Sequence, residues 1–173
     1  VVSFWSTWIA CFGIWKEDLK AIKGFSRYSD LQLVQTDVLL RLISSGRAVY
    51  VDNSIIFKTK NPKGKGGYNF YKVFVLNYLS LLEEYTKSNQ ISRTTYFNEK
   101  TKLLLYHILP TSLSILNDKT KYSFNLKGAL PIVIKKYFFH PILYLCLIYF
   151  FIKVPLSFLR KKLVELKNKQ NRQ

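Results

Sequence analysis

The sequence predicts an α/β fold that is followed by a helical tail, and three observations predict it. Residues 31–45 carry apolar side chains at helical spacing and are followed by Gly46, a typical helix stop. Two short apolar segments, 48–51 and 55–58, come next and are typical of strands. Near the C-terminus, residues 141–152 are twelve consecutive uncharged positions, nearly all of them large and apolar. This order indicates strands and helices first and a separate apolar tail afterwards.

The segments before the first long helix are assigned from composition. Residues 1–15 are rich in aromatic side chains and are predicted to be extended, and residues 16–22 are predicted to form a short helix that ends at Gly24. Ser29 or Asp30 is expected to cap the helix that follows, because short polar side chains accept hydrogen bonds from free backbone amides at a helix start.

The middle of the chain is predicted to be helical between polar connections. Residues 61–67 are a loop by their glycine, proline and lysine content, and residues 117–125 are a polar connector. Helices are expected at 70–87 and 94–109, and Pro110 is expected to kink or interrupt the second of them.

The net charge of +17 requires an anionic partner, which is nucleic acid, anionic lipid or a phosphorylated substrate. From Lys119 onward there are twelve lysines and arginines and a single acid, Glu165. These cations flank the apolar run rather than a stacking motif or a groove-sized helix, so a membrane surface is favoured and nucleic acid is not expected.

The apolar run is too short to predict a membrane span. About 20 apolar residues are needed to cross a bilayer, whereas this run is bounded by Lys136 and Lys153, and Pro141 and Pro155 lie at its two ends. We therefore expect one or two amphipathic helices that lie in the membrane interface, with a buried pair of core helices as the alternative.

Cysteine and histidine do not indicate a metal site or a disulfide framework in this segment. Cys11 and Cys146 each lie among apolar residues, and so do His107 and His140, which are far apart in the sequence. We expect ordinary packing roles for all four.

Residue Val1 and the absence of methionine lead to one further expectation. A complete gene product begins with methionine, so we expect an N-terminal portion of the gene product to be missing from this chain.

Three ordered groups of residues carry a resemblance to a known family. The first is Asp37-Val-Leu-Leu-Arg41-Leu-Ile-Ser-Ser-Gly46 with Val49-Tyr50-Val51, and the second is the upstream segment 9–19 that leads to Gly24 and Phe25. The third is Gly66-Gly67-Tyr68-Asn69 together with residues 73–78. Between Val1 and Tyr85, the chain resembles the C-terminal part of a family 2 glycosyltransferase of GT-A type, in the abequosyltransferase-like group of bacterial surface-polysaccharide biosynthesis.

The resemblance implies a partial GT-A fold that lacks its nucleotide-binding half. It divides the chain into an acceptor-side part of the GT-A domain (1–60), a loop with a helical extension (61–125), and membrane-associated helices with a basic tail (126–173). The family transfers sugar from a nucleotide sugar to a saccharide on polyprenyl diphosphate, in O-antigen (lipopolysaccharide) or capsule-type synthesis. A divalent Mg or Mn ion is expected through a motif in the missing half, and the segment alone is expected to be inactive. Its place is then the cytoplasmic face of the bacterial inner membrane, as a peripheral protein.

The resemblance also supplies candidate site residues. The family's acidic pair falls at Val34 and Gln35, neither of which is acidic, so Asp37 is the candidate catalytic base and Asp30 a nearby substitute. The candidate substrate-binding residues are Trp5, Trp8, Gln35, Arg41, Lys58, Lys63 and Lys65. Several have a plainer interpretation: Asp37 and Arg41 are spaced for a helix ion pair, the tryptophans suit core packing and the lysines suit a surface loop. A non-enzymatic, basic membrane-surface protein is the alternative function.

Overall fold

The computed structural model describes residues 13–24, 30, 32–47, 65–117, 122–153 and 155. These residues are mostly helical and include one small sheet of two parallel strands. The strands expected at 48–51 and 55–58, the segment 1–12 and the basic tail beyond 155 lie outside the described residues. The partial GT-A fold therefore stays a prediction.

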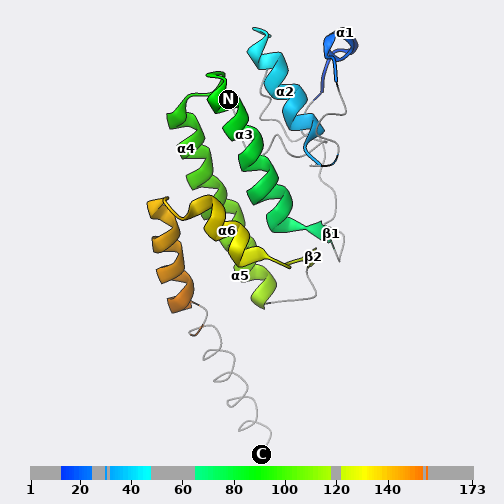
Figure 1. Cartoon of the computed structure of the whole chain (residues 1–173). Helices are drawn as coiled ribbons and strands as arrows, with labels where there is room; N and C mark the ends of the chain where they lie inside the picture. Colours follow the sequence, from blue (N-terminus) through cyan, green and yellow to red (C-terminus); the bar gives the residue numbers. More distant parts are fainter. Residues whose placement is uncertain are drawn as a thin grey trace, which may run out of the picture.

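Two long antiparallel helices form the centre of the molecule (Figure 1). The first joins a π-helical segment, η4 (Lys72–Asn77), to α3 (Tyr78–Lys87), and the second joins α4 (Arg93–Lys102), η5 (Leu103–Ile108) and α5 (Leu109–Asn117). Between them, Ser92 caps α4 by accepting a 3.0 Å hydrogen bond from the backbone N–H of Thr95. The predictions of helices at 70–87 and 94–109 are confirmed.

Pro110 does not end the second helix, which continues eight residues past the predicted end, from 109 to Asn117. Proline has no N–H, and in a regular helix its ring collides with the carbonyl four residues earlier. Here the widened turns of η5 come directly before it: the N–H of Leu109 bonds to the carbonyl of Leu104, five residues back. The prediction that Pro110 interrupts this helix is therefore wrong, because one continuous helix runs through it.

The core lies between these two helices. Its fully enclosed members include Val75, Tyr78, Leu79, Leu82 and Leu103. On α3, Tyr78, Leu81, Leu82 and Tyr85 recur at spacings of three and four residues, so one side of the helix is buried.

The small sheet corrects two sequence predictions. Strand β1 (Lys65–Asn69) pairs in parallel with β2 (Tyr122–Asn125), whereas the sequence predicted a loop to 67 and an irregular connector to 125. The pairing joins residues 56 or 57 positions apart, as in Asn69 with Asn125 and Lys65 with Tyr122. A glycine- and lysine-rich segment has no local preference for a strand, so its partner strand must supply it.

The C-terminal part adds two helices, α6 (Ala129–Tyr137) and a helix over residues 141–153. The sequence predicted a break at Pro141, and the chain turns there. The inner faces of both helices join the same core: Tyr137, Leu143 and Cys146 are buried, and the Tyr137 hydroxyl donates to the carbonyl of Lys100 over 2.9 Å. In the part of the chain that the structure describes, no helix is long and apolar enough to cross a membrane.

Helices α1 (Lys16–Ala21) and α2 (Val34–Ser44) lie at one end of the central pair (Figure 1). The predicted cap of α2 is wrong, because the helix starts three residues later than expected and Leu33 precedes it without a side-chain cap. Gly46 ends it as predicted: with φ at +81°, it lets its own N–H reach Ile43 and that of Arg47 reach Leu42.

The core predicts the effect of shortening Leu82, whose side chain is fully enclosed. Leu82→Ala should lower the free energy of unfolding by about 2–5 kcal/mol, because it removes buried methyl groups and leaves a cavity. Leu130→Ala is the matched control, since Leu130 is 62% exposed, and should change it by less than about 0.5 kcal/mol. Urea denaturation measures both, and equal losses would contradict this assignment of the core.

Candidate functional site

A buried ionic network joins α2 to α3 at the residue that the sequence proposed as a catalytic base. Asp37 lies in the first turn of α2 and is 1% exposed. Its Oδ2 is 2.6 Å from Nη2 of Arg41, one turn later, and its Oδ1 accepts a 2.8 Å hydrogen bond from the hydroxyl of Tyr85 on α3. Arg41 Nη1 donates to the carbonyl of Lys23 over 2.6 Å. The network thereby ties α2 both to α3 and to the segment after α1.

The electrostatics of this network keep each group in the state that the contacts require. Burial raises the pKa of the Tyr85 hydroxyl, and the hydrogen bond to Asp37 raises it further, so the hydroxyl stays a donor. Burial by itself would lower the pKa of Arg41, but the hydrogen bond and the charge of Asp37 outweigh it and raise the pKa overall. Arg41 therefore remains a cation opposite the carboxylate.

The geometry gives Asp37 an ion-pair role. A general base must lie within hydrogen-bond reach of the hydroxyl that it deprotonates. Both carboxylate oxygens of Asp37 already have protein partners, and the side chain is enclosed. In this arrangement the carboxylate serves to hold Arg41 and Tyr85, which is the plainer of the two interpretations that the sequence allowed.

The other candidate residues are distributed around this network or lie outside the described chain. Gln35 is half-buried on α2, and Asp30 is exposed ahead of that helix. Lys65 begins strand β1. Trp5, Trp8, Lys58 and Lys63 fall outside the described residues. The structure thus brings together Asp37 and Arg41 from the predicted set.

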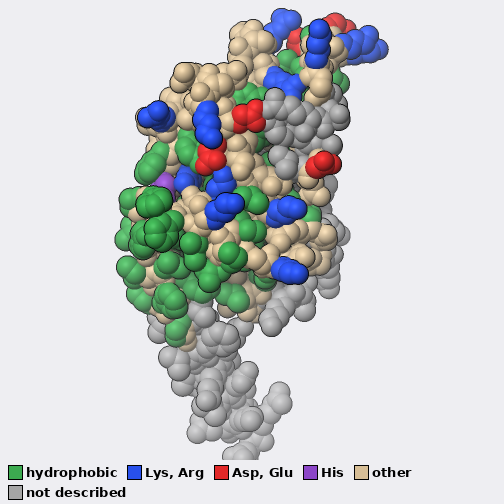
Figure 2. All heavy atoms as spheres, in the orientation of Figure 1, with side chains coloured by type: hydrophobic (Ala, Val, Ile, Leu, Met, Phe, Trp, Pro, Cys, Tyr) green, Lys and Arg blue, Asp and Glu red, His purple; other side chains and the backbone are tan. Residues whose placement is uncertain are grey.

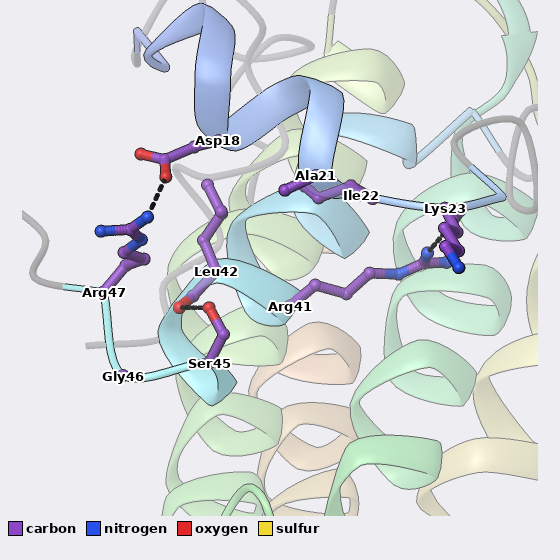
Figure 3. A pocket seen from close by; sticks show the side chains of 9 residues that line it. All are labelled: Asp18, Ala21, Ile22, Lys23, Arg41, Leu42, Ser45, Gly46 and Arg47. Carbon is purple, nitrogen blue, oxygen red and sulfur yellow. Dashed lines mark hydrogen bonds and ion pairs between the residues drawn. The ribbon is translucent and has the colours of Figure 1, made fainter.

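An open pocket of about 690 Å³ lies beside the network, between α1 and the C-terminal end of α2 (Figure 3). Arg47 on its rim pairs with Asp18 of α1 at 2.9 Å, and Arg41 reaches it from the network. The last carbonyls of α2 carry partial negative charge, which these cations offset. Arg41 and Arg47 each have a carboxylate partner, and Lys23 adds a third cation to the lining of the pocket.

Metal ligands do not gather anywhere in the part of the chain that the structure describes. No three of its His, Cys, Asp and Glu side chains lie close enough together to hold a metal ion. The metal expected from the resemblance was assigned to a segment outside this chain, so that expectation stays a prediction.

In the described part of the chain, an apolar face lies on the two C-terminal helices. Large apolar side chains gather over them in Figure 2. We call this set the docking face, and its exposed members are Leu130, Ile134, Phe138, Phe139, Tyr144, Leu145, Ile148, Tyr149, Phe151 and Ile152. Contiguous apolar side chains that stay exposed on a folded protein indicate an interaction site.

Under the docking face, a second ionic cluster holds α6 to the core. Lys136 Nζ lies 2.8 Å from Oε2 of Glu83 on α3, and the hydroxyl of Tyr96 on α4 donates to Oε1 over 2.8 Å. The Lys136 side chain is 10% exposed and that of Glu83 is 37% exposed, so the pair is half-buried. Sequence reasoning missed Tyr85, Glu83 and Tyr96, because their partners lie 48, 53 and 13 positions away and no local pattern marks them.

Comparisons with known proteins give no further guide. No family model, no curated protein and no solved structure matches this chain.

The network predicts a stability cost when Tyr85 loses its hydroxyl. Tyr85→Phe should lower the free energy of unfolding by about 1–3 kcal/mol, because a hydrogen bond to a buried carboxylate is removed and that carboxylate keeps a single partner. Tyr106→Phe is the matched control, since Tyr106 is 68% exposed, and should be nearly neutral. Thermal or urea unfolding measures the difference, and equal behaviour of the two variants would contradict the network.

Proposed function

We propose that this chain holds a family 2 glycosyltransferase on an anionic membrane surface through its C-terminal helices. The proposed place is the cytoplasmic face of the bacterial inner membrane. There the enzyme would transfer sugar from a nucleotide sugar to a saccharide on polyprenyl diphosphate. The docking face carries the membrane part of the proposal, and the resemblance of residues 1–85 carries the enzymatic part.

The helix over 141–153 has the two-sided form that a membrane surface requires. Its inner positions 143, 146, 147 and 150 follow the helical repeat and face the core or its edge, while positions 145, 148, 149 and 152 follow the same repeat on the exposed side. No helix among the described residues is long and apolar enough to cross a membrane. A helix with one buried side and one exposed apolar side is suited to lie along the interface.

Charge complements the apolar face. Residues 126–153 contain four lysines and no carboxylate. Lys135 is exposed on α6 beside Ile134, and Lys153 is exposed with its ammonium 5.7 Å from the centre of the Tyr149 ring. Tyrosine and lysine at the edge of an apolar face match the headgroup layer, where each cation near an anionic surface adds about 1 kcal/mol of attraction.

Several residues of the segment that resembles the transferase family contact one another in the folded chain. Asp37, Arg41 and Tyr85 all fall within the segment that carries the resemblance, and a single buried network connects them. The same network suits a purely structural role, so a non-enzymatic membrane-surface protein remains the second candidate function. The docking face favours both candidates equally.

The docking face predicts a loss of lipid binding when it is made polar. The triple variant Leu145→Ser, Ile148→Ser, Ile152→Ser should bind vesicles of phosphatidylglycerol and phosphatidylethanolamine at least about thirtyfold more weakly, because each buried aliphatic side chain contributes about 1 kcal/mol or more. Salt should weaken binding of the unaltered chain without abolishing it, since the apolar part is not screened.

The matched control replaces three exposed large apolar residues elsewhere, as Trp15→Ser, Tyr106→Ser, Leu116→Ser. Flotation through a density gradient compares the two variants with the unaltered chain. Equal loss in both variants, or no loss in either, would refute docking through this face.

The enzymatic part of the proposal predicts how a substitution of Asp37 changes kcat in the complete transferase. If Asp37 is the base, Asp37→Asn should lower kcat at least about tenfold, since a positioned base supplies about a hundredfold or more. Tyr85→Phe is the matched control, because it weakens the same network and keeps the carboxylate. Both are assayed with a nucleotide sugar well below their unfolding temperatures. An unchanged kcat in Asp37→Asn would show that the Asp37 carboxylate serves only in its ion pair with Arg41.

A further inference from the structure

His140 lies at the corner between α6 and the 141–153 helix and is 4% exposed. Its ring stacks on Phe97 of α4 with the ring centres 4.2 Å apart. Its Nε2 is 3.3 Å from the hydroxyl of Thr101, also on α4, and its Nδ1 accepts a 3.4 Å hydrogen bond from the backbone N–H of Ile142. One side chain thus contacts both α4 and the start of the last described helix.

The contact to Ile142 makes His140 the side-chain cap of the 141–153 helix. A cap residue precedes the first helical position and accepts a hydrogen bond from the second or third N–H, and Ile142 holds the second position. Pro141 holds the first position, where the missing N–H of proline costs nothing. The contact requires an unprotonated Nδ1, so the ring carries its proton on Nε2, which faces Thr101.

Protonation of His140 is incompatible with this geometry. A protonated Nδ1 would direct its own N–H at the N–H of Ile142, and the new positive charge would lie at the positive end of the helix dipole. Burial lowers the pKa of His140 below its ordinary value of 6.5, and the charge of Lys100 on α4 lowers it further, while a hydrogen bond with the backbone of Phe97 raises it.

The groups around the ring do not offset that charge. Tyr137 of α6 lies edge-on to it at 5.8 Å between ring centres, and burial raises the pKa of its hydroxyl, so it stays neutral. The carboxylate of Glu83 on α3 is taken by Lys136 and Tyr96, and that of Glu99 on α4 pairs with Lys102. The helix over 141–153 contains no acid.

The direction of the pH effect follows from the lowered pKa. The unfolded or detached helix binds the proton more readily than the packed one. The packed state therefore has its full stability above pH 6.5, and this stability is lost as the pH falls through 6.5 toward the lower pKa of the packed state.

Detachment would change what the helix offers to a membrane. In the packed state, Leu143 and Cys146 face the core and the opposite side forms part of the docking face. A detached helix would present apolar side chains on every side, and a helix of that kind partitions more strongly into lipid than one with a single exposed face.

We propose that His140 is a pH-sensitive switch that holds the 141–153 helix against the core when neutral and releases it to the membrane when protonated. The release of the helix is argued from the cap geometry, and its effect on membrane binding rests on the proposed membrane docking. Negatively charged lipid attracts protons, so the surface that binds the helix would also favour its release.

The first test measures release without any lipid, through Cys146, which is 6% exposed and buried in the core. In a Cys11→Ser background, Cys146 is the chain's one remaining cysteine. Its reaction with 4,4′-dithiodipyridine is followed from about pH 7.5 to about pH 5.5 and divided by the rate of a small thiol at each pH. The normalised rate should rise at least about threefold on acidification, because the helix detaches more often.

His140→Asn is the informative variant, because asparagine caps a helix well and does not titrate. It should keep the low rate at every pH. His107→Asn is the matched control, because burial also lowers the pKa of His107, but His107 lies within η5 and far along the chain from the cap. In this variant the normalised Cys146 rate should rise on acidification as much as in the unaltered protein. A rate that is independent of pH in the unaltered chain, or that rises equally in His140→Asn, would overturn the switch.

The second test adds vesicles of phosphatidylglycerol and phosphatidylethanolamine. Binding of the unaltered chain should strengthen at least about threefold over the same pH range, and binding of His140→Asn should not. Docking without any pH dependence would refute the switch and leave the proposed function standing. A pH-dependent Cys146 rate without vesicle binding at any pH would support the cap mechanism and refute the membrane docking.

Discussion

The packing of η4–α3 against α4–η5 is the interaction on which the rest of the structure depends. Helices α2 and α6 and the corner before the last described helix are each fixed to one of these two helices. Tyr85 of α3 holds α2 through Asp37, Glu83 of α3 holds α6 through Lys136, and α4 receives the corner at His140. The apolar seam between the two helices supplies most of the buried side chains, so weakening it would loosen the attached helices as well.

The attachments share a chemistry that the charge of the chain explains. Twenty-seven lysines and arginines face ten acids, so an acid placed at a helix contact relieves repulsion as well as forming a bond. The ion pairs Asp18–Arg47 and Glu83–Lys136 join neighbouring elements, and Asp37–Arg41 lies within α2 at its contact with α3. In two of these pairs a tyrosine hydroxyl, from Tyr85 or Tyr96, fills the remaining acceptor position of the carboxylate. A buried carboxylate needs both kinds of partner, because each unsatisfied oxygen costs desolvation energy.

Local sequence signals predict the helices, and they fail where contacts between residues far apart in the sequence determine the structure. Periodic apolar residues and Gly46 predicted α2 closely at its end, but no polar cap marks its start at Val34, which the contacts of Asp37 fix instead. The strand at Lys65–Asn69 was invisible because its composition is that of a loop and its partner is Tyr122–Asn125. At the site, the spacing of Asp37 and Arg41 predicted their pairing, whereas Tyr85 came from a helix 48 residues away. The apolar tail could be recognised from composition, but which of its faces is buried depends on how it packs against the core.

The C-terminal helices show why composition alone could not separate a core helix from a membrane-surface helix. The two alternatives describe the two sides of the same helix. Leu143 and Cys146 satisfy the core, and Leu145 and Ile148 remain in water on the opposite side. One side of this helix packs on the protein core, and the opposite side is suited to a membrane. Both surroundings are apolar, so a few polar contacts can decide which of them the helix prefers. His140 supplies the polar contacts at one end of the helix, to Thr101 and to the N–H of Ile142, and it is also the group there whose charge changes near neutral pH. The corner at His140 is therefore where a small change in solution conditions can shift the helix from one environment to the other.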